Sequence, residues 1–121
     1  MKEIKAFIHR DRIAEVLQAL NASGFRSIGE RSGCRNICVS SVQSLINPVE
    51  TADQHYSMEL AAPVVHEWKL ELFCEDTQAD QLVDIVRQAA RIGHGVAGWI
   101  FVIDIVNAVP VTGVAGRGSA G

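Results

Sequence analysis

The stretch VVHEWKLELFC, residues 64–74, alternates without a break between two sets of side chains. Alternation with a period of two is the pattern of a β-strand, because successive side chains point to opposite faces of the sheet. The stretch therefore predicts a long strand whose two faces differ. One face carries Val64, His66, Trp68, Leu70, Leu72 and Cys74, and the other carries Val65, Glu67, Lys69, Glu71 and Phe73. The charged residues of the second face are best interpreted as a solvated or intersubunit salt-bridge row.

A strand and a helix are predicted before this stretch. Residues 2–9 alternate, and Asp11 is a credible N-cap for a helix that runs to about Asn21. Gly24 suits the left-handed position that ends a helix. The apolar stripe of the helix has the spacing i, i+3, i+4, i+7 and consists of Ile13, Val16, Leu17 and Leu20.

A second helix and a last strand are predicted after it. Asp76 or Thr77 would cap the helix, which is followed by a glycine-rich turn at residues 92–98. Residues 99–106 are apolar on both faces and predict a buried central strand. Asp104 would then be a buried carboxylate in need of a partner, such as Arg91 or a residue of another subunit. The apolar stripe of the second helix consists of Leu82, Ile85, Val86 and Ala89.

This order of elements predicts an α+β, ferredoxin-like split βαβ sandwich, with two helices on one face of a four-stranded antiparallel sheet. The helix-free face would carry Phe7, Phe73 and one side of the last strand. Because so apolar a face should not be left in water, we expect further copies of the chain to cover it. The domain would span residues 1–111, with a long excursion between strands and a flexible glycine-rich tail at 112–121.

Composition excludes several classes of function. The chain has 121 residues, 48% of them hydrophobic, and a formal net charge of −3. We therefore expect one folded domain without the clustered basic surface that nucleic-acid binding needs. No apolar run approaches the ~20 residues of a membrane span, and the charged N-terminus lacks a signal-peptide core, so we expect a cytoplasmic protein that is not membrane-embedded. No set of nucleophile, base and orienting residue is present, so we do not expect an enzyme.

Three segments give the chain a resemblance to the PII-type nitrogen-regulatory signal-transduction family. They are MKEIKAFIHRDRIAEVLQALNASGF (residues 1–25), KLELFCEDTQADQLVDIVRQAARIGHG (69–95) and GWIFV (98–102). The chain is most similar to the divergent PII-like branch called PII-NG, whose members share an HEWKLEL-type strand and a YS-x-EL segment, here residues 56–60. The resemblance implies a ferredoxin-like homotrimer with its sheets packed inward. It also implies an exposed T-loop, here about residues 42–62, that engages a target protein such as a membrane transporter or metal-efflux system.

The same resemblance implies a nucleotide site between subunits. PII proteins bind ATP or ADP with a glycine-rich turn, which corresponds to residues 90–102 of this chain. The family's lysines in that turn are replaced here by His94 and Trp99, and its arginine pair after the last strand is missing. Since cationic donors supply most of the grip on phosphate, we expect an adenine nucleotide to bind weakly. The implied cofactor-binding residues are Arg91, Gly93, His94, Gly95, Gly98 and Trp99.

A metal site is an alternative. Cys34 and Cys38, together with a histidine such as His55, are residue types that bind a soft metal such as Cu(I) or Zn(II). The simpler interpretation is two unrelated small residues. Three functions stay open at this point: a regulatory trimer with a small effector, a trimeric metal-binding protein of the copper-tolerance type, and an adaptor trimer without an effector.

Overall fold

A computed structural model describes residues 1–24, 35–45, 54–93 and 95–113. The predictions for Cys34, His94 and the tail beyond residue 113 lie outside the described residues. The elements, in chain order, are β1 (Lys2–His9), α1 (Ile13–Ala22), β2 (Arg35–Ser44), β3 (Gln54–Ser57), β4 (Ala62–Cys74), the 3₁₀ turn η2 (Asp76–Gln78), α2 (Ala79–Ala89) and β5 (Trp99–Asp104).

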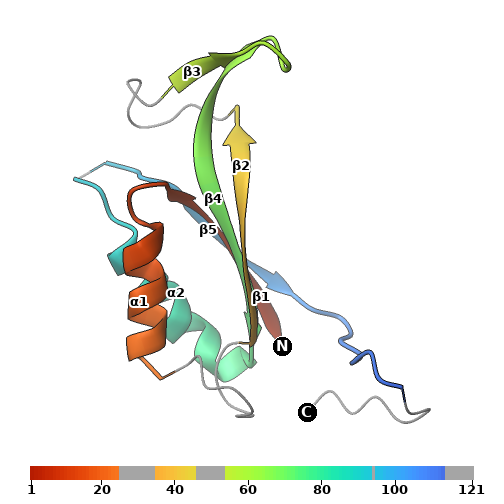
Figure 1. Ribbon diagram of the computed structural model, residues 1–121. Helices are drawn as coiled ribbons and strands as arrows, with labels where there is room; N and C mark the ends of the chain where they lie inside the picture. The colour runs from red at the N-terminus through yellow and green to blue at the C-terminus, as the bar shows by residue number, and fades with distance from the viewer. Residues whose placement is uncertain (25–34, 46–53, 94, 114–121) are drawn as a thin grey trace.

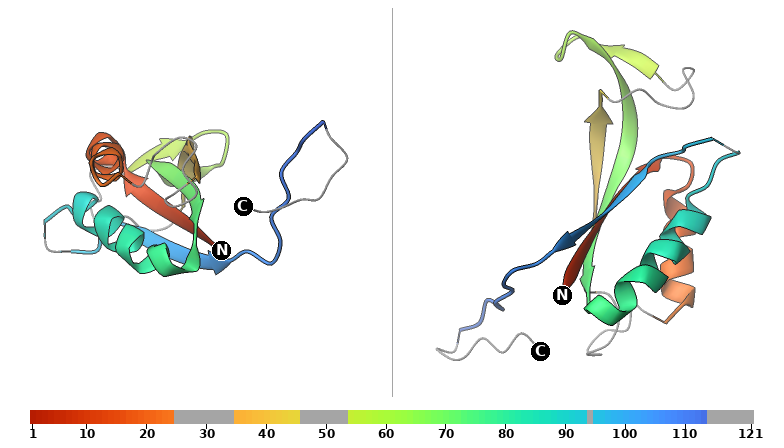
Figure 2. Two further views of the ribbon diagram at one scale, coloured as in Figure 1. Left: turned by 90° about the horizontal axis from the view of Figure 1, so that it is seen from below. Right: turned by 180° about the vertical axis from the view of Figure 1, so that it is seen from behind.

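The strands form one antiparallel sheet in the order β2–β4–β1–β5, with β3 also paired to β4. β1 lies at the centre, where Lys2 stands opposite Cys74 and His9 opposite Glu67. Both helices lie on one face of the sheet (Figure 1), and the views from below and from behind show the same two layers (Figure 2). The ferredoxin-like α+β arrangement predicted from the sequence is confirmed, with a fifth strand added.

The core lies between the helices and the sheet. Six residues of β1 and β4 lie on the predicted face under the helices and are each at most 2% exposed, whereas His66 and Trp68, farther along the same face of β4, are only partly buried. Burial of one such side chain is worth about 1.5–3 kcal/mol relative to exposure, so this layer supplies most of the drive to fold. Its members are Ile4, Ala6, Ile8, Leu70, Leu72 and Cys74 from the strands, with Val16, Leu20, Leu82 and Val86 from the helices.

The added strand builds an arm. Val65 of β4 stands opposite both Ser44 of β2 and Gln54 of β3. A strand residue has one neighbour on each edge, so β2 and β3 lie on opposite edges of β4. β3 therefore occupies the edge of β4 that β1 leaves free beyond Glu67. We call described residues 42–45 and 54–66 the arm, which projects beyond the helix-packed body (Figure 1). The excursion expected at 42–62 thus contains strand on both sides of its undescribed part.

The prediction that residues 99–106 form a buried central strand was wrong. β5 ends at Asp104 and lies at the edge of the sheet, where it pairs with β1 alone. On the helix-free side of this edge strand, Trp99 is 57% exposed and Phe101 is 46% exposed in the single chain. Asp104 is exposed rather than buried, and its partner is the ammonium of Lys2, not Arg91. An apolar strand at an edge needs a covering surface that the described residues of one copy do not supply.

The predicted N-caps were also wrong. α1 begins at Ile13, and neither its N-cap Arg12 nor the α2 N-cap Gln78 makes a side-chain capping hydrogen bond. Asp76 lies in η2, and its carboxylate accepts a hydrogen bond from the N-terminal ammonium at 2.6 Å. The carboxylate is thus paired with the ammonium of Met1 instead of capping α2.

The helix-free face is divided into an aromatic half and a charged half. On the β1–β5 half, the rings of Phe7 and Phe101 meet edge to face with centroids 6.3 Å apart. On the β4 half, Glu71 lies 3.8 Å from the ammonium of Lys5 and 3.6 Å from that of Lys69. The apolar surface predicted for this face is therefore concentrated along β5 and at Phe7 of β1.

Candidate functional site

The candidate site lies at the end of the sheet where β1 stops and β5 starts. Phe7 of β1 stands opposite Trp99 of β5, so the turn after β1 and the loop before β5 leave the sheet side by side. That loop, residues 90–98, is the glycine-rich turn singled out by the sequence. The arm leaves the body at the same end, because His9 is opposite Glu67.

Gly98 fixes the loop against β1. A Cβ built on Gly98 would lie 2.2 Å from the carbonyl oxygen of Phe7, far inside van der Waals contact. Only glycine allows this close approach of two backbones. Gly93 has a φ of +59°, a left-handed conformation that other residues rarely adopt. Glycine is therefore needed at both ends of the loop, at Gly93 for the turn and at Gly98 for contact with the sheet.

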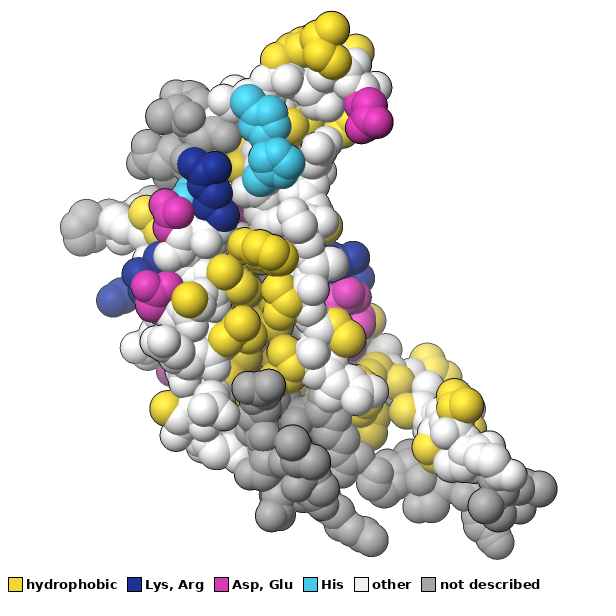
Figure 3. All heavy atoms as spheres, in the orientation of Figure 1, with side chains coloured by type: hydrophobic (Ala, Val, Ile, Leu, Met, Phe, Trp, Pro, Cys, Tyr) yellow, Lys and Arg dark blue, Asp and Glu magenta, His cyan; other side chains and the backbone are white. Residues whose placement is uncertain are grey.

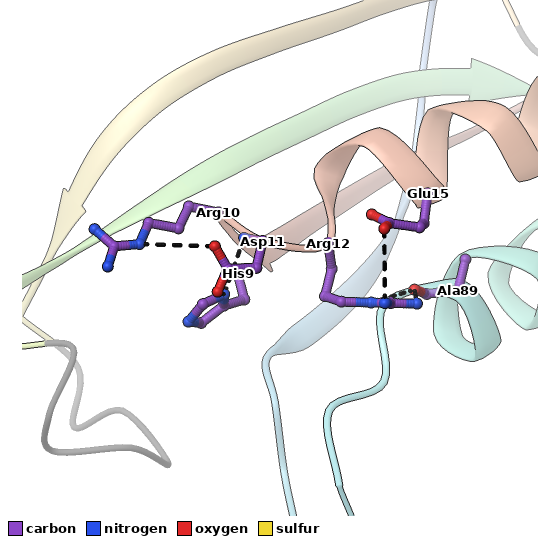
Figure 4. A network of polar contacts seen from close by, with 6 residues as sticks. All are labelled: His9, Arg10, Asp11, Arg12, Glu15 and Ala89. Atoms are coloured by element: carbon purple, nitrogen blue, oxygen red, sulfur yellow. Dashed lines mark hydrogen bonds and ion pairs between the residues drawn. The ribbon is translucent and has the colours of Figure 1, made fainter.

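Arg12 ties the start of α1 to the end of α2. Its guanidinium donates through Nε and one Nη to the carbonyl oxygen of Ala89, at 3.1 and 2.8 Å (Figure 4). A cation at the last carbonyls of a helix is favourable both as a hydrogen-bond donor and toward the helix dipole. Glu15 lies 3.8 Å from the same guanidinium. The loop that begins at Ala90 is thus held at its start by Arg12 and at its end by Gly98.

The turn after β1 adds a second polar network (Figure 4). The backbone N–H of Asp11 donates to Nδ1 of His9 at 3.0 Å, which fixes that nitrogen as an acceptor. The carboxylate of Asp11 also lies 4.0 Å from Nε of Arg10, whose side chain is 58% exposed. Asp11 therefore belongs to this turn, and the N-cap position of α1 is taken by Arg12.

The arrangement is suited to holding an anion. Arg91, within the loop itself, is exposed, and backbone amides of a glycine-rich loop bind anions in their own right. Guanidinium groups grip phosphate or carboxylate through paired hydrogen bonds. The exposed ring of Trp99 offers a flat surface next to the loop. Sequence reasoning singled out the loop but missed Arg12, whose signal was the RDR run directly after the first strand.

The predicted metal ligands are not brought together within the described chain. Cys38 stands opposite Glu71, whereas His55 stands opposite Val64. Those two positions on β4 are about 23 Å apart at about 3.3 Å per residue. Among the described residues, no group of three or more His, Cys, Asp or Glu side chains is placed to hold a metal ion. A site made of Cys34, Cys38 and His55 stays a prediction.

The tip of the arm is an ordered hairpin between β3 and β4. The Oγ of Ser57 is buried and accepts the backbone N–H of Leu60 at 3.2 Å, and Ala61 takes a φ of +53°. Met58, by contrast, is 86% exposed, and Tyr56 and Leu60 are also exposed. The hairpin therefore presents apolar side chains outward.

Comparisons with known proteins match nearly the whole chain to one group. Nitrogen regulatory proteins P-II 1 and P-II 2 of Methanothermobacter thermautotrophicus are each 25% identical over 118 residues, 97% of this chain and 95% of each relative. Nitrogen regulatory protein GlnK2 of Haloferax mediterranei is 27% identical over 118 residues, 97% of this chain and 89% of that protein. The chain is a relative of the PII proteins. No family model matches it.

The PII relationship supports a regulatory signalling protein. Because the matched region spans 97% of the chain, it includes both the loop at 90–98 and the arm. In the described part of the chain, no helix is long and apolar enough to cross a membrane.

Proposed function

We propose that the chain is a PII-type trimeric regulator that senses a small anionic effector, of the adenine-nucleotide class, and signals through the arm to a target protein. The effector would lie between subunits, against the loop at 90–98 of one copy. The target would dock on the arm, and a membrane transporter or metal-efflux system is the class of target that the family resemblance implies. The copies would assemble in the cytoplasm.

The observation that carries this proposal is the double anchoring of the loop. Arg12 holds its start to α1 and Gly98 holds its end to β1, at the end of the sheet from which the arm projects. An effector that orders this loop therefore acts next to the base of the arm. A ligand shifts a conformational equilibrium only if it binds one state better, and this placement gives it that opportunity.

The chemistry of the site favours modest affinity. Arg91, with the loop amides, supplies donors for a phosphate, and Trp99 supplies a ring on which a base can stack. The lysines of a typical PII turn are absent from this one, so fewer charge-assisted bonds are available. We expect ADP and ATP to bind with similar and weak affinity, because the site offers few additional positively charged side chains to bind the third phosphate of ATP.

The exposed edge strand supports assembly. Trp99, Phe101 and Ile103 share the helix-free side of β5 and are each more than one-third exposed in a single chain. Aromatic side chains of this size gain most from burial when a second copy covers them. Light scattering on the purified chain should give the mass of a trimer, and Phe101→Asp should lower that mass. A monomeric wild-type mass would contradict the proposed assembly.

The test of effector binding is isothermal titration with ATP, ADP and AMP, supported by thermal shift. We expect Arg91→Ala to lower affinity about tenfold, as loss of one charge-assisted phosphate contact should. The matched control is Arg87→Ala, because Arg87 is an exposed arginine on α2 that pairs with Asp84. If no nucleotide binds at millimolar concentration, or if both variants weaken binding equally, the nucleotide proposal fails.

A further inference from the structure

The arm carries a pair of stacked histidines that neither the predicted loop site nor the predicted cysteine site explains. The rings of His55 on β3 and His66 on β4 are 4.4 Å apart between centroids and inclined by 20°. His55 is opposite Val64, so His66 is its diagonal neighbour on the same face. Figure 3 shows two histidine side chains together on the surface of the arm, open to solvent.

We propose that His55 and His66 form a two-histidine site for a divalent transition-metal ion of the Zn(II), Ni(II) or Cu(II) class. Neutral imidazole is the side chain that suits these ions, and both rings stand in reach of water rather than in the core. Metal–nitrogen bonds of about 2.0–2.1 Å in a tetrahedral site place two ligand nitrogens about 3.3 Å apart. Because an imidazole nitrogen binds a metal in the plane of its ring, the two rings must leave the stack and turn until those nitrogens converge on one ion, which changes of side-chain rotamer provide.

The pairing of β3 with β4 holds the two histidines close together before any metal binds. His55 and His66 come from different strands, and the β3–β4 ladder, which includes the pair formed by His55 with Val64, fixes the distance between their Cα atoms. Two ligands that are held close lose little freedom when a metal binds, so the chain binds the ion better than two separate imidazoles would. Since no third such ligand gathers with them among the described residues, water or a second molecule completes the coordination shell.

Metal at this position would act as a clamp on the arm. β3 has only four residues and pairs with β4 alone. A short two-stranded hairpin is marginal in water, so a bond across it through a metal raises the population of the paired form. This inference concerns a ligand and a place different from the nucleotide proposal, and each can fail without the other.

Two variants separate this site from the cysteine-containing one, because His55 belongs to both. His66→Gln removes a ligand of the two-histidine site only, and Cys38→Ala removes a ligand of the cysteine site only. His55 is exposed, so His55→Gln tests the pair without disturbing the core. His9→Gln is the matched control, since His9 lies at the end of β1 with Nδ1 already engaged.

The first measurement is competition for Zn(II) between the full chain and a colorimetric chelator, in the absence of nucleotide. The second is a titration of the chain with Ni(II), in which the imidazole proton signals are followed by NMR. We expect one ion per chain, with affinity lowered at least about tenfold by His55→Gln or His66→Gln and unchanged by Cys38→Ala or His9→Gln. Nickel should broaden the signals of His55 and His66 first. The proposal is overturned if the wild-type chain binds neither ion, if His66→Gln binds as the wild type does, or if Cys38→Ala abolishes binding.

Discussion

Replacement of Gly98 by alanine should be among the most damaging single-methyl changes in the protein. The new Cβ would lie 2.2 Å from the carbonyl oxygen of Phe7, whereas ordinary contact begins at 3.4 Å. Either the loop or β1 must therefore yield by more than 1 Å at that contact. β1 is held by ladders on both edges, so it cannot move alone. Overpacking of this kind costs about 1–3 kcal/mol.

The other glycines provide a graded series of controls. Gly113→Ala meets no atom within 4 Å and should leave stability unchanged. Gly93→Ala also meets no atom, but its φ of +59° is left-handed, which costs a non-glycine residue about 1–2 kcal/mol. Urea denaturation at one fixed protein concentration, followed by tryptophan fluorescence, measures all three.

We expect the midpoint of thermal unfolding to fall for Gly98→Ala by roughly 4–8 °C per kcal/mol lost. We also expect weaker nucleotide binding, because the loop would leave its place beside β1. The reasoning is refuted if Gly98→Ala unfolds at the same urea concentration as Gly113→Ala, since the close contact would then impose no constraint.

Three further predictions follow from the contacts described. Arg12→Met should cost about 1–2 kcal/mol by freeing the last carbonyl of α2, whereas Glu15→Gln, at a half-exposed pair, should cost less than about 0.5 kcal/mol in the same urea assay. Leu70→Ala, at a fully buried position, should cost about 2–5 kcal/mol, and a loss under 1 kcal/mol would contradict the assigned core. The hydrogen bond from the N-terminal ammonium lowers the pKa of Asp76 below its ordinary 3.8, so the pair stabilises the fold above that pH and the stabilisation is lost as pH falls through the lowered pKa. Asp76→Asn should remove that step from the acid dependence of stability, and an unchanged acid profile would show that the ion pair does not form in solution.

Alternation in the sequence predicted the central strands well because the helix side of β1 and of the second half of β4 is buried. Residues 2–9 became β1, and residues 64–74 lie within β4. The same rule failed for residues 99–106. A strand that is apolar on both faces is central in one chain or exposed at an edge that other copies cover, and the two cases share one pattern. Burial in the single chain, not periodicity, separates them.

β3 could not have been predicted from its own residues. The segment QHYS is too short to show a period, and it is a strand because β4 continues past the end of β1 and offers a free edge. The glycine loop was predictable, since glycine marks close approach and turns. The role of Arg12 was not, because its contact with Ala89 depends on α1 packing next to α2, a contact between residues far apart in the chain.

β4 has a mechanical consequence. Its 13 residues form one uninterrupted strand, roughly 43 Å long, of which one part is pinned under the helices and the other is the spine of the arm. Because β4 continues without interruption from the arm into its ladder with β1, a force applied at Met58 would act on that ladder. A force that twists the tip would therefore load β1 through its ladder with β4, and Gly98 rests on that same strand at Phe7.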